Sequence, residues 1–218
     1  TGTYVGFTAD RVPYDGTEPG RWARDVTEPQ IVHWYQQWGS GDSRFRGDWL
    51  RQVSDRGRVP MISWEAWVKP DNGFKLPDQK LGNMADIAAG RYDAYIDTWA
   101  KAAATYRRPI LIRPFHEMNG DWYPWAVGVN GNTAETYVAG WRHVVDRFRA
   151  AGASNVSFIW SINNIRPGDK GDVVRAAYPG DDYVDWVATS GFNWDDFSKP
   201  LVDGISMYDG KMVSIPFD

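Results

Sequence analysis

Cysteine is absent from this chain of 218 residues. Its absence excludes disulfide bonds, zinc sites built on thiolates and a cysteine nucleophile. It leaves the cellular compartment open, because secreted proteins without disulfides exist. Histidine is scarce, with 3 residues. Because His33 is expected inside a strand and His143 on a helix, we expect no histidine metal site and no cofactor.

Excess positive charge and long apolar runs are also lacking. The formal net charge is -4, the isoelectric point is about 5.4, and no basic patch is evident, which argues against a nucleic-acid partner. No apolar run approaches the roughly 20 residues of a membrane-spanning helix, so no membrane partner is expected. The chain begins at Thr1 without a methionine or a signal-like segment, which is typical of a processed or trimmed protein.

Tryptophan, in contrast, is abundant, with 13 residues, and aromatic residues make up 15 % of the chain. A core accommodates few tryptophans, because the ring is bulky and its N–H needs a partner. We therefore expect several of them to line an open cleft. Flat amphipathic rings in a cleft suit sugars, whose C–H faces stack on them.

Short apolar runs alternate with helical or long-loop segments, a pattern typical of parallel βα units. Strands are expected over residues 4–8, 31–35, 59–64, 110–113, 156–161 and 184–190, with a candidate seventh over 211–216. Helices are expected over residues 49–56, 84–88, 92–105 and 134–150. Thr133 is suited to cap the last of these helices at its N-terminus.

Several of these apolar runs end in tryptophan, asparagine, glutamate or histidine. In a TIM barrel such residues meet at the carboxyl-terminal rim, where ligands bind. We therefore predict an α/β protein with a TIM (β/α)8-type barrel, as a single catalytic domain spanning residues 1–218. A closed barrel needs eight strands and we find six to seven βα units, so we expect the barrel to be incomplete at its C-terminus.

The segment 109–125, PILIRPFHEMNGDWYPW, concentrates polar and aromatic residues just beyond a buried strand. Large aromatic side chains are unusual in a loop without a use for them. Burial among such rings raises the pKa of a carboxylic acid and suits it to act as a general acid. Glu117 fits this description, because it follows His116 and precedes the tryptophans of the segment.

Hydrolysis of a glycoside needs two carboxyl groups. Three of the five glutamates, Glu18, Glu28 and Glu135, are expected to be structural. Glu65 and Glu117 are placed at strand ends, where both reach the rim.

The segment RPFHEMNGDWYPW resembles the acid/base motif of glycoside hydrolase family 26. That family contains endo-β-mannanases, mixed-linkage β-glucanases and β-1,3-xylanases. The resemblance extends to ISWEAW at 62–67 and to residues 87–100, 141–163 and 191–194, so it covers most of the chain.

The resemblance implies a retaining TIM-barrel glycosidase whose acid/base glutamate follows the fourth strand, as Glu117 does. It also implies that His116 and Trp122 help to form the subsite around the cleaved bond. The full set of expected substrate-binding residues is Trp38, Trp64, Glu65, Trp67, Arg113, His116, Asn119, Trp122, Trp125, Asn193 and Trp194.

One departure from the family concerns the nucleophile, a glutamate after the seventh strand. The corresponding segment, 211–218, contains no glutamate, and Asp218 is its only acid and a weak candidate. Either the chain is a fragment that ends before the nucleophile, or its end is divergent.

We expect an endo-acting retaining β-glycoside hydrolase that cleaves β-mannan or mixed-linkage β-1,3-1,4-glucan and is secreted to the extracellular space. The alternative is a carbohydrate-binding fragment or pseudoenzyme without a nucleophile. A complete chain is expected to be a monomer, whereas a truncated barrel with open edges is expected to self-associate.

Other conspicuous residues are expected to be structural. His33 is expected to be a hydrogen-bonded histidine of the core. The acidic pairs at 181–182 and 195–196 lack the ligand pattern of a calcium loop and are expected to be solvated. Three tryptophans inside expected elements are assigned to the core: Trp99, Trp141 and Trp186.

Overall fold

The protein is represented by a computed structural model that describes residues 4, 6–8, 29–39, 43–67, 80–164 and 171–190. Six strands form one sheet in the order β1-β2-β3-β4-β5-β6, and every neighbouring pair is parallel. The strands are β1 (Gly6–Thr8), β2 (Ile31–Gln37), β3 (Val59–Glu65), β4 (Ile110–Pro114), β5 (Val156–Asn163) and β6 (Trp186–Ser190).

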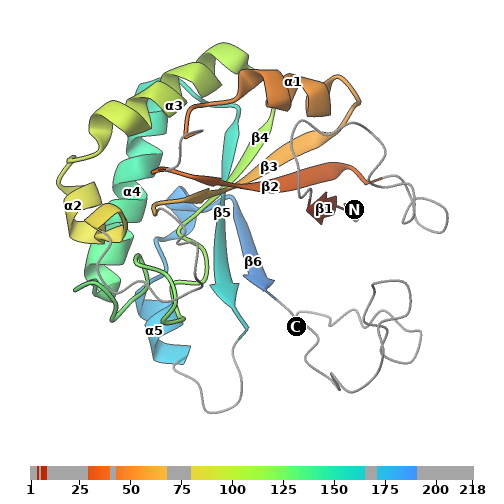
Figure 1. The fold of residues 1–218 in the computed structure, drawn as a ribbon. Coiled ribbons are helices and arrows are strands. Elements are labelled where there is room, and N and C mark those ends of the chain that lie inside the picture. The colour runs from red at the N-terminus through yellow and green to blue at the C-terminus, as the bar shows by residue number, and fades with distance from the viewer. Residues whose placement is uncertain are drawn as a thin grey trace, which may run out of the picture.

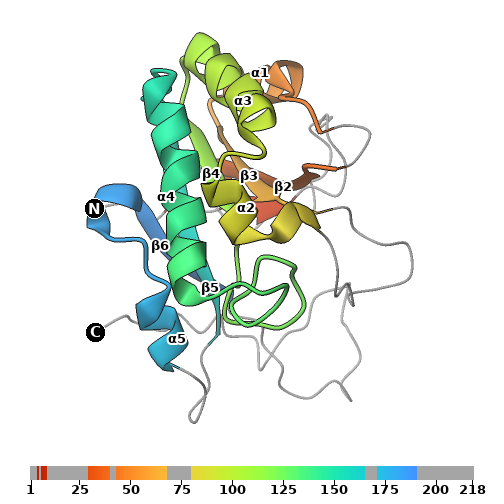
Figure 2. The same cartoon turned by 90° about the vertical axis from the view of Figure 1, so that its left-hand side faces the viewer.

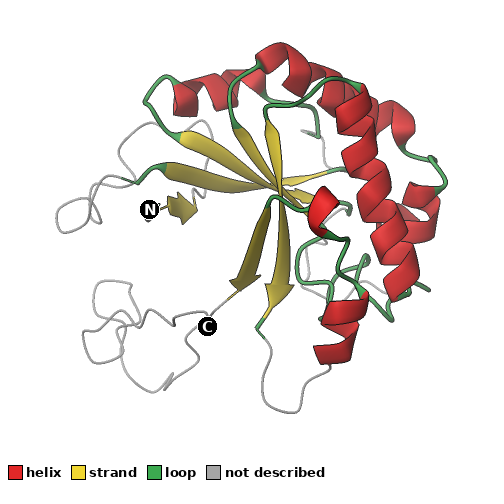
Figure 3. Cartoon of the chain, turned by 180° about the vertical axis from the view of Figure 1, so that it is seen from behind, coloured by secondary structure: helices red, strands yellow, loops and turns green. Residues whose placement is uncertain are grey.

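The helices gather on one side of this curved sheet (Figures 1 and 3). They are α1 (Gly47–Ser54), α2 (Met84–Ala88), α3 (Asp93–Tyr106), α4 (Ala134–Ala150) and α5 (Gly171–Ala176), with short 3-10 helices η2 (Lys80–Gly82) and η3 (Asp181–Tyr183). Strands in spatial sequence order with helices on one face are the arrangement of a (β/α)8-type barrel. Within the described residues, β1 and β6 each pair with one neighbour, so the barrel is incomplete.

The core lies between the sheet and the helices, and aromatic residues dominate it. Trp64 of β3 is fully buried there. Its ring centroid lies 4.8 Å from that of Trp99 on α3 and 5.8 Å from that of Phe148 on α4. Alternation along each strand sends residues such as Trp34 and Ile112 to this helix side and their neighbours to the opposite side.

The α2–α4 contact beside the sheet is unusually close (Figure 2). A Cβ atom at Gly140 of α4 would lie 2.9 Å from the carbonyl oxygen of Met84, which is too close for any larger residue. α4 begins with a reciprocal capping box, in which Thr133 and Thr136 each bond the other's backbone N–H. Thr133 is therefore the N-cap, as the sequence predicts.

The predicted strands at 4–8, 31–35, 59–64, 110–113, 156–161 and 184–190 are confirmed with small shifts of their ends. α5 was not anticipated from the sequence. The candidate seventh strand lies outside the described residues, and the assignment of one domain to residues 1–218 stays a prediction. Trp99 and Trp141 are buried in the core as expected, but Trp186 is 52 % exposed, so its assignment to the core is wrong.

Candidate active site

The loop after β4 has a constrained backbone. Phe115 and Glu117 adopt left-handed conformations, with φ of 46° and 55°. Residues other than glycine rarely take this conformation unless surrounding contacts hold them in it. Here the backbone N–H of Glu117 donates to the carbonyl oxygen of Ser161 at 2.8 Å, and Tyr137 Oη donates to the carbonyl oxygen of Phe115 at 2.9 Å. The loop is thereby fixed to β5 and α4.

Glu117 is buried, with 9 % of its surface exposed, and one of its carboxylate oxygens is held by a tryptophan. Trp122 Nε1 donates to Glu117 Oε2 at 3.0 Å. Trp122 is only partly buried, unlike the other tryptophans near this loop. The bond from Trp122 therefore holds the Glu117 carboxylate in place beside an aromatic ring that is partly exposed.

His116 lies directly before Glu117 and is almost completely buried. Its Nε2 lies 3.0 Å from Tyr123 Oη and 3.8 Å from Glu65 Oε1. Burial, followed by the charge of Arg113 and the nearby His33, lowers the pKa of His116 well below its usual range, so the ring is neutral at pH 7. Burial, followed by the charges of Glu65 and Glu117, raises the pKa of Tyr123, which keeps its hydroxyl protonated.

Arg113 occupies the inner face of β4 and is also 9 % exposed. Its guanidinium donates to three hydroxyl groups on three other strands: Ser63 Oγ at 2.8 Å, Ser161 Oγ at 3.3 Å and Tyr35 Oη at 3.4 Å. All three acceptors are neutral. Among the described residues no carboxylate forms an ion pair with Arg113.

His33 extends this network across the inner face of the sheet. His33 Nε2 lies 2.7 Å from Ser63 Oγ, and Nδ1 lies 2.9 Å from Thr8 Oγ1. Burial, followed by the charge of Arg113, lowers the pKa of His33 to about 3, so this ring is neutral at pH 7. The expectation of a hydrogen-bonded core histidine is confirmed. One chain of polar contacts therefore links β1 to β5.

Two asparagines, the partly buried Asn119 and the buried Asn132, hold the site loop in place. Asn119 Nδ2 donates to the carbonyl oxygen of Asn163 at 3.0 Å, and Asn119 Oδ1 accepts from the N–H of Asn163 at 2.8 Å. The buried Asn132 side chain donates to the carbonyl oxygens of Gly82 and Pro124 and accepts from the N–H of Met84. The amide of Asn119 thus joins the loop to β5, and Asn132 joins it to η2 and α2.

The structure corrects the expected position of four tryptophans. Trp38, Trp64, Trp67 and Trp125 were expected to line the cleft, but all four are buried. Trp38 and Trp64 pack against α3, with ring centroids 5.3 Å and 5.7 Å from Tyr95. Trp67 donates to Glu65 Oε2 at 3.0 Å and Trp125 donates to the carbonyl oxygen of His116 at 2.8 Å. These four rings pack in the core against α3 and the residues of the site, and they do not face an open cleft.

The structure brings together most of the remaining predicted site residues: Glu65, Arg113, His116, Glu117, Asn119 and Trp122. Asn193, Trp194 and Asp218 lie outside the described residues. Sequence reasoning missed Tyr35 and Ser63, and it named Tyr123 and Ser161 at strand ends without including them among the expected site residues. The signal for Ser63 was present, because it lies two residues before Glu65 and therefore on the same face of the strand.

Among the described residues, no group of three or more side chains of the metal-binding types is close enough to hold a metal ion. In the same part of the chain, none of the helices has the length and apolar character needed to cross a bilayer.

The architecture and the site define the class of the protein: an incomplete (β/α)8-type barrel with a buried acid at the carboxyl end of its fourth strand. A sequence profile of glycosyl hydrolase family 26 matches residues 59–209. The chain therefore belongs to glycosyl hydrolase family 26, as the resemblance implied.

Several characterised proteins are similar to this chain. It is 40 % identical over 170 residues to endoglucanase H of Acetivibrio thermocellus, covering 75 % of this chain and 17 % of that protein. It is 30 % identical over 178 residues to a mannan endo-1,4-beta-mannosidase of Bifidobacterium adolescentis, covering 76 % of this chain and 17 % of that protein. The chain thus spans under a fifth of the length of these two relatives.

Solved structures give the same fold. An endo-beta-1,4-mannanase of Cellulomonas fimi superposes with a TM-score of 0.64 at 24 % identity, covering 88 % of this chain and 49 % of that chain. A mannanase of Bacillus subtilis superposes with a TM-score of 0.62 at 20 % identity, covering 92 % of this chain and 66 % of that chain. At these identities the likeness supports the fold alone.

Proposed function

We propose that this chain carries the acid/base side of an endo-acting retaining β-glycoside hydrolase. The observation that carries the proposal is Glu117, a buried carboxylic acid held in a left-handed backbone conformation at the carboxyl end of β4 and bonded by Trp122. Backbone strain concentrates at functional positions, and the carboxyl ends of barrel strands are where barrel enzymes place their catalytic groups.

In the proposed reaction, Glu117 protonates the oxygen of the leaving sugar and later takes a proton from the attacking water. The N–H of Trp122 holds one carboxylate oxygen and leaves the other for the glycosidic oxygen. A second carboxylate forms the covalent glycosyl intermediate. Asp218 stays the weak candidate for that role, and Asn193 and Trp194 stay predicted substrate contacts.

The proposed substrate is β-mannan or mixed-linkage β-1,3-1,4-glucan. The similar proteins include an endoglucanase and a mannan endo-1,4-beta-mannosidase, which supports both choices. Because such polymers are too large to enter a cell, we also propose that the protein works as a secreted, extracellular enzyme.

The test is release of reducing sugar from glucomannan and from barley β-glucan. Glu117→Gln removes the proton donor and should lower kcat on these substrates by about 10²- to 10⁴-fold, with little change in binding. Glu135→Gln, in the exposed first turn of α4, is the matched control and should keep wild-type activity. Full activity in Glu117→Gln would refute the assignment of the acid/base residue.

A second candidate function is carbohydrate binding without catalysis. It is favoured by one observation, that the segment 211–218, which corresponds to the nucleophile segment of the family, contains no glutamate. Saturable binding of either polymer, without hydrolysis by the wild-type chain, would support this alternative over the enzyme.

A further inference from the structure

Arg113 is deeply buried, and among the described residues no carboxylate neutralises its charge. Its three acceptors are the hydroxyl groups of Ser63, Ser161 and Tyr35. A buried charge without a counter-ion is strongly unfavourable, because neutral hydroxyls replace the lost hydration only in part. Arginine is also the residue whose planar fork best matches a carboxylate.

Other arginines of the chain show what a satisfied guanidinium looks like here. Arg147, whose side chain is 33 % exposed, bonds both oxygens of Asp97 and lies 3.4 Å from Asp93. Arg108 lies 2.5 Å from Asp55 on the surface. Each of these two less buried arginines has a carboxylate partner, whereas the buried Arg113 has none among the described residues.

A second polar group beside Arg113 is also left without a partner. His116 Nδ1 is buried and makes no hydrogen bond. Tyr35 connects the two groups, because its ring centroid lies 5.9 Å from the Arg113 guanidinium and 5.9 Å from the His116 ring. Tyr35 itself is 51 % exposed, so this group of side chains reaches the surface through Tyr35.

We propose that Arg113, with Tyr35 and His116, forms a carboxylate-binding site, filled in the working enzyme by the second catalytic carboxylate. This deepens the proposed function and rests on it for the identity of the occupant. Arg113 is then a positioning residue that holds the nucleophile, in contrast to the substrate contact expected from the sequence. Ser161 supports the geometry, because its hydroxyl accepts from Arg113 while its carbonyl oxygen accepts from the N–H of Glu117.

The position fits the reaction. In retaining glycosidases the two carboxyl groups lie about 5–5.5 Å apart. Ser161 binds both Arg113, through its hydroxyl, and the backbone N–H of Glu117, through its carbonyl oxygen, so one residue of β5 holds the two positions. A positive charge there also keeps the bound carboxylate ionised, which a nucleophile requires.

The first test measures anion binding without any substrate. Sodium formate is titrated against the Asp218→Asn variant, which lacks this chain's candidate for the occupant, at constant ionic strength with sodium chloride replacing it, and the melting temperature is recorded. The further variants are made in this background. A saturable rise specific to formate is expected, because a ligand that binds only the folded state stabilises it. A flat response of Asp218→Asn overturns the proposal.

Two variants locate the site. Arg113→Met should abolish the formate effect, and Arg113→Lys, which keeps the charge but loses the fork, should weaken the apparent affinity by about tenfold. An unchanged formate response in both variants overturns the proposal. Arg113→Lys keeps the test decisive if Arg113→Met does not fold.

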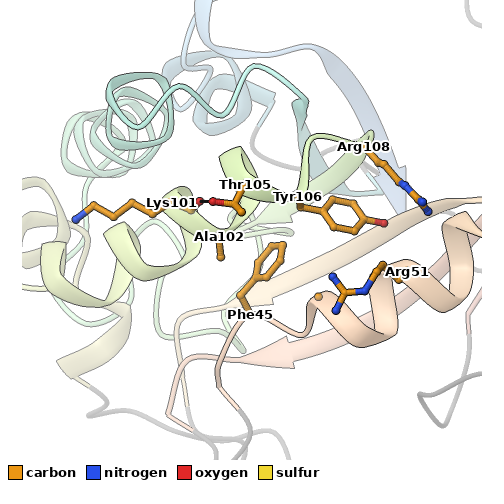
Figure 4. Close-up of a pocket in the computed structure, with 8 residues that line it drawn as sticks. Phe45, Arg51, Lys101, Ala102, Thr105, Tyr106 and Arg108 are labelled. Atoms are coloured by element: carbon orange, nitrogen blue, oxygen red, sulfur yellow. Dashed lines mark hydrogen bonds between the residues drawn. The ribbon is translucent and has the colours of Figure 1, made fainter.

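The matched control is an exposed cationic groove between α1 and α3, lined in part by Arg108 just before β4 begins (Figure 4). This cavity of about 590 Å³ is lined by Arg51, Lys101, Arg108, Phe45 and Tyr106. Arg51→Met removes a surface cation there and should leave the formate effect intact. Loss of the effect in Arg51→Met places the anion in the groove and overturns the proposal.

The second test asks whether the bound anion can act as nucleophile. With azide and a 2,4-dinitrophenyl β-mannobioside or β-cellobioside, azide nitrogen bonds to the anomeric carbon as the bond to the phenol oxygen breaks. The electron pair leaves with the phenolate and no proton is transferred. The expected product is a glycosyl azide of inverted configuration, formed by Asp218→Asn and when Arg51→Met is added to it, but not when Arg113→Met is added.

The two tests separate the anion site from the enzymatic function. Formate binding that depends on Arg113, without azide transfer, supports the site and counts against the glycosidase. Azide transfer that survives Arg113→Met supports the glycosidase and overturns the role of Arg113.

Discussion

The helix side and the inner side of the sheet handle polar groups differently. Between α3 and α4, Arg147 meets Asp93 and Asp97, and His143 Nε2 lies 2.6 Å from Asp93 Oδ1. On the inner side, Arg113 meets hydroxyl groups alone among the described residues, and His116 Nδ1 meets nothing. The charged groups between α3 and α4 therefore have ionic partners, whereas the described residues of the inner side offer Arg113 hydroxyl groups alone.

The largest expected effect is a loss of stability when the packing on the helix side of the sheet is disrupted. Trp64→Ala should lower the free energy of unfolding by about 3–5 kcal/mol, because it leaves a cavity between β3 and α3. Urea denaturation followed by fluorescence measures it. Trp186→Ala, at a tryptophan that is 52 % exposed, is the matched control and should change stability by much less. Equal losses would show that Trp64 is not a core residue.

The next largest effect is a pH dependence of stability that arises from His33 on the inner side of the sheet. The pKa of His33 is lowered from 6.5 to about 3 in the folded state, because the fold accepts the ring only in its neutral form. The free energy of unfolding is therefore at its full value above pH 6.5 and falls as pH drops toward 3, since the unfolded state then binds a proton that the folded state does not. The expected slope is at most about 1.4 kcal/mol per pH unit for one histidine. His33→Gln should flatten the stability profile between pH 6 and 4 (the approximate window of that slope). An unchanged profile would contradict the buried neutral state.

A smaller effect concerns the bond between the loop and the acid. Trp122→Phe removes the N–H donor to Glu117 Oε2 and should lower kcat on β-glucan or mannan by about tenfold, or about 1.4 kcal/mol. Trp49→Phe is the control, because the indole N–H of Trp49 is buried without a partner. Equal activities of the two variants would mean that the bond does not serve the acid.

The smallest effect sharpens the comparison of the two arginines. Arg113→Met should leave the free energy of unfolding unchanged or raise it, because a buried unpaired charge is replaced by an apolar chain. Arg147→Met should lower it by about 0–1 kcal/mol, the range of partly exposed ion pairs. Both are measured by thermal unfolding in chloride buffer. A clear loss of stability in Arg113→Met would show that the hydroxyl partners alone satisfy the charge.

Local sequence patterns predicted the elements well. The apolar runs gave the six strands, and the order of strands and helices gave a barrel incomplete within the described residues. α5 escaped, since it spans only Gly171–Ala176 and none of its residues is buried. A short exposed helix has no apolar stripe from which to recognise it.

The tryptophans show where the pattern was insufficient. A tryptophan at a strand end reaches either the helices or the rim, and the two positions differ by a single step in the alternation of the strand. Trp64 and Glu65 are neighbours, yet Trp64 faces α3 and Glu65 faces His116. Their shared position at the end of an apolar run was the reason for expecting both at the cleft.

The sequence by itself determined the family, the parallel barrel and the position of Glu117 after the fourth strand, because these depend on local periodicity and on a contiguous motif. Only the tertiary structure decided which tryptophans are core, how Trp122 holds the acid, and that Arg113 is buried among hydroxyls from three other strands. The burial of Arg113 depends on contacts between residues about 50 positions apart, such as Ser63 with Arg113 and Arg113 with Ser161, which no local pattern encodes.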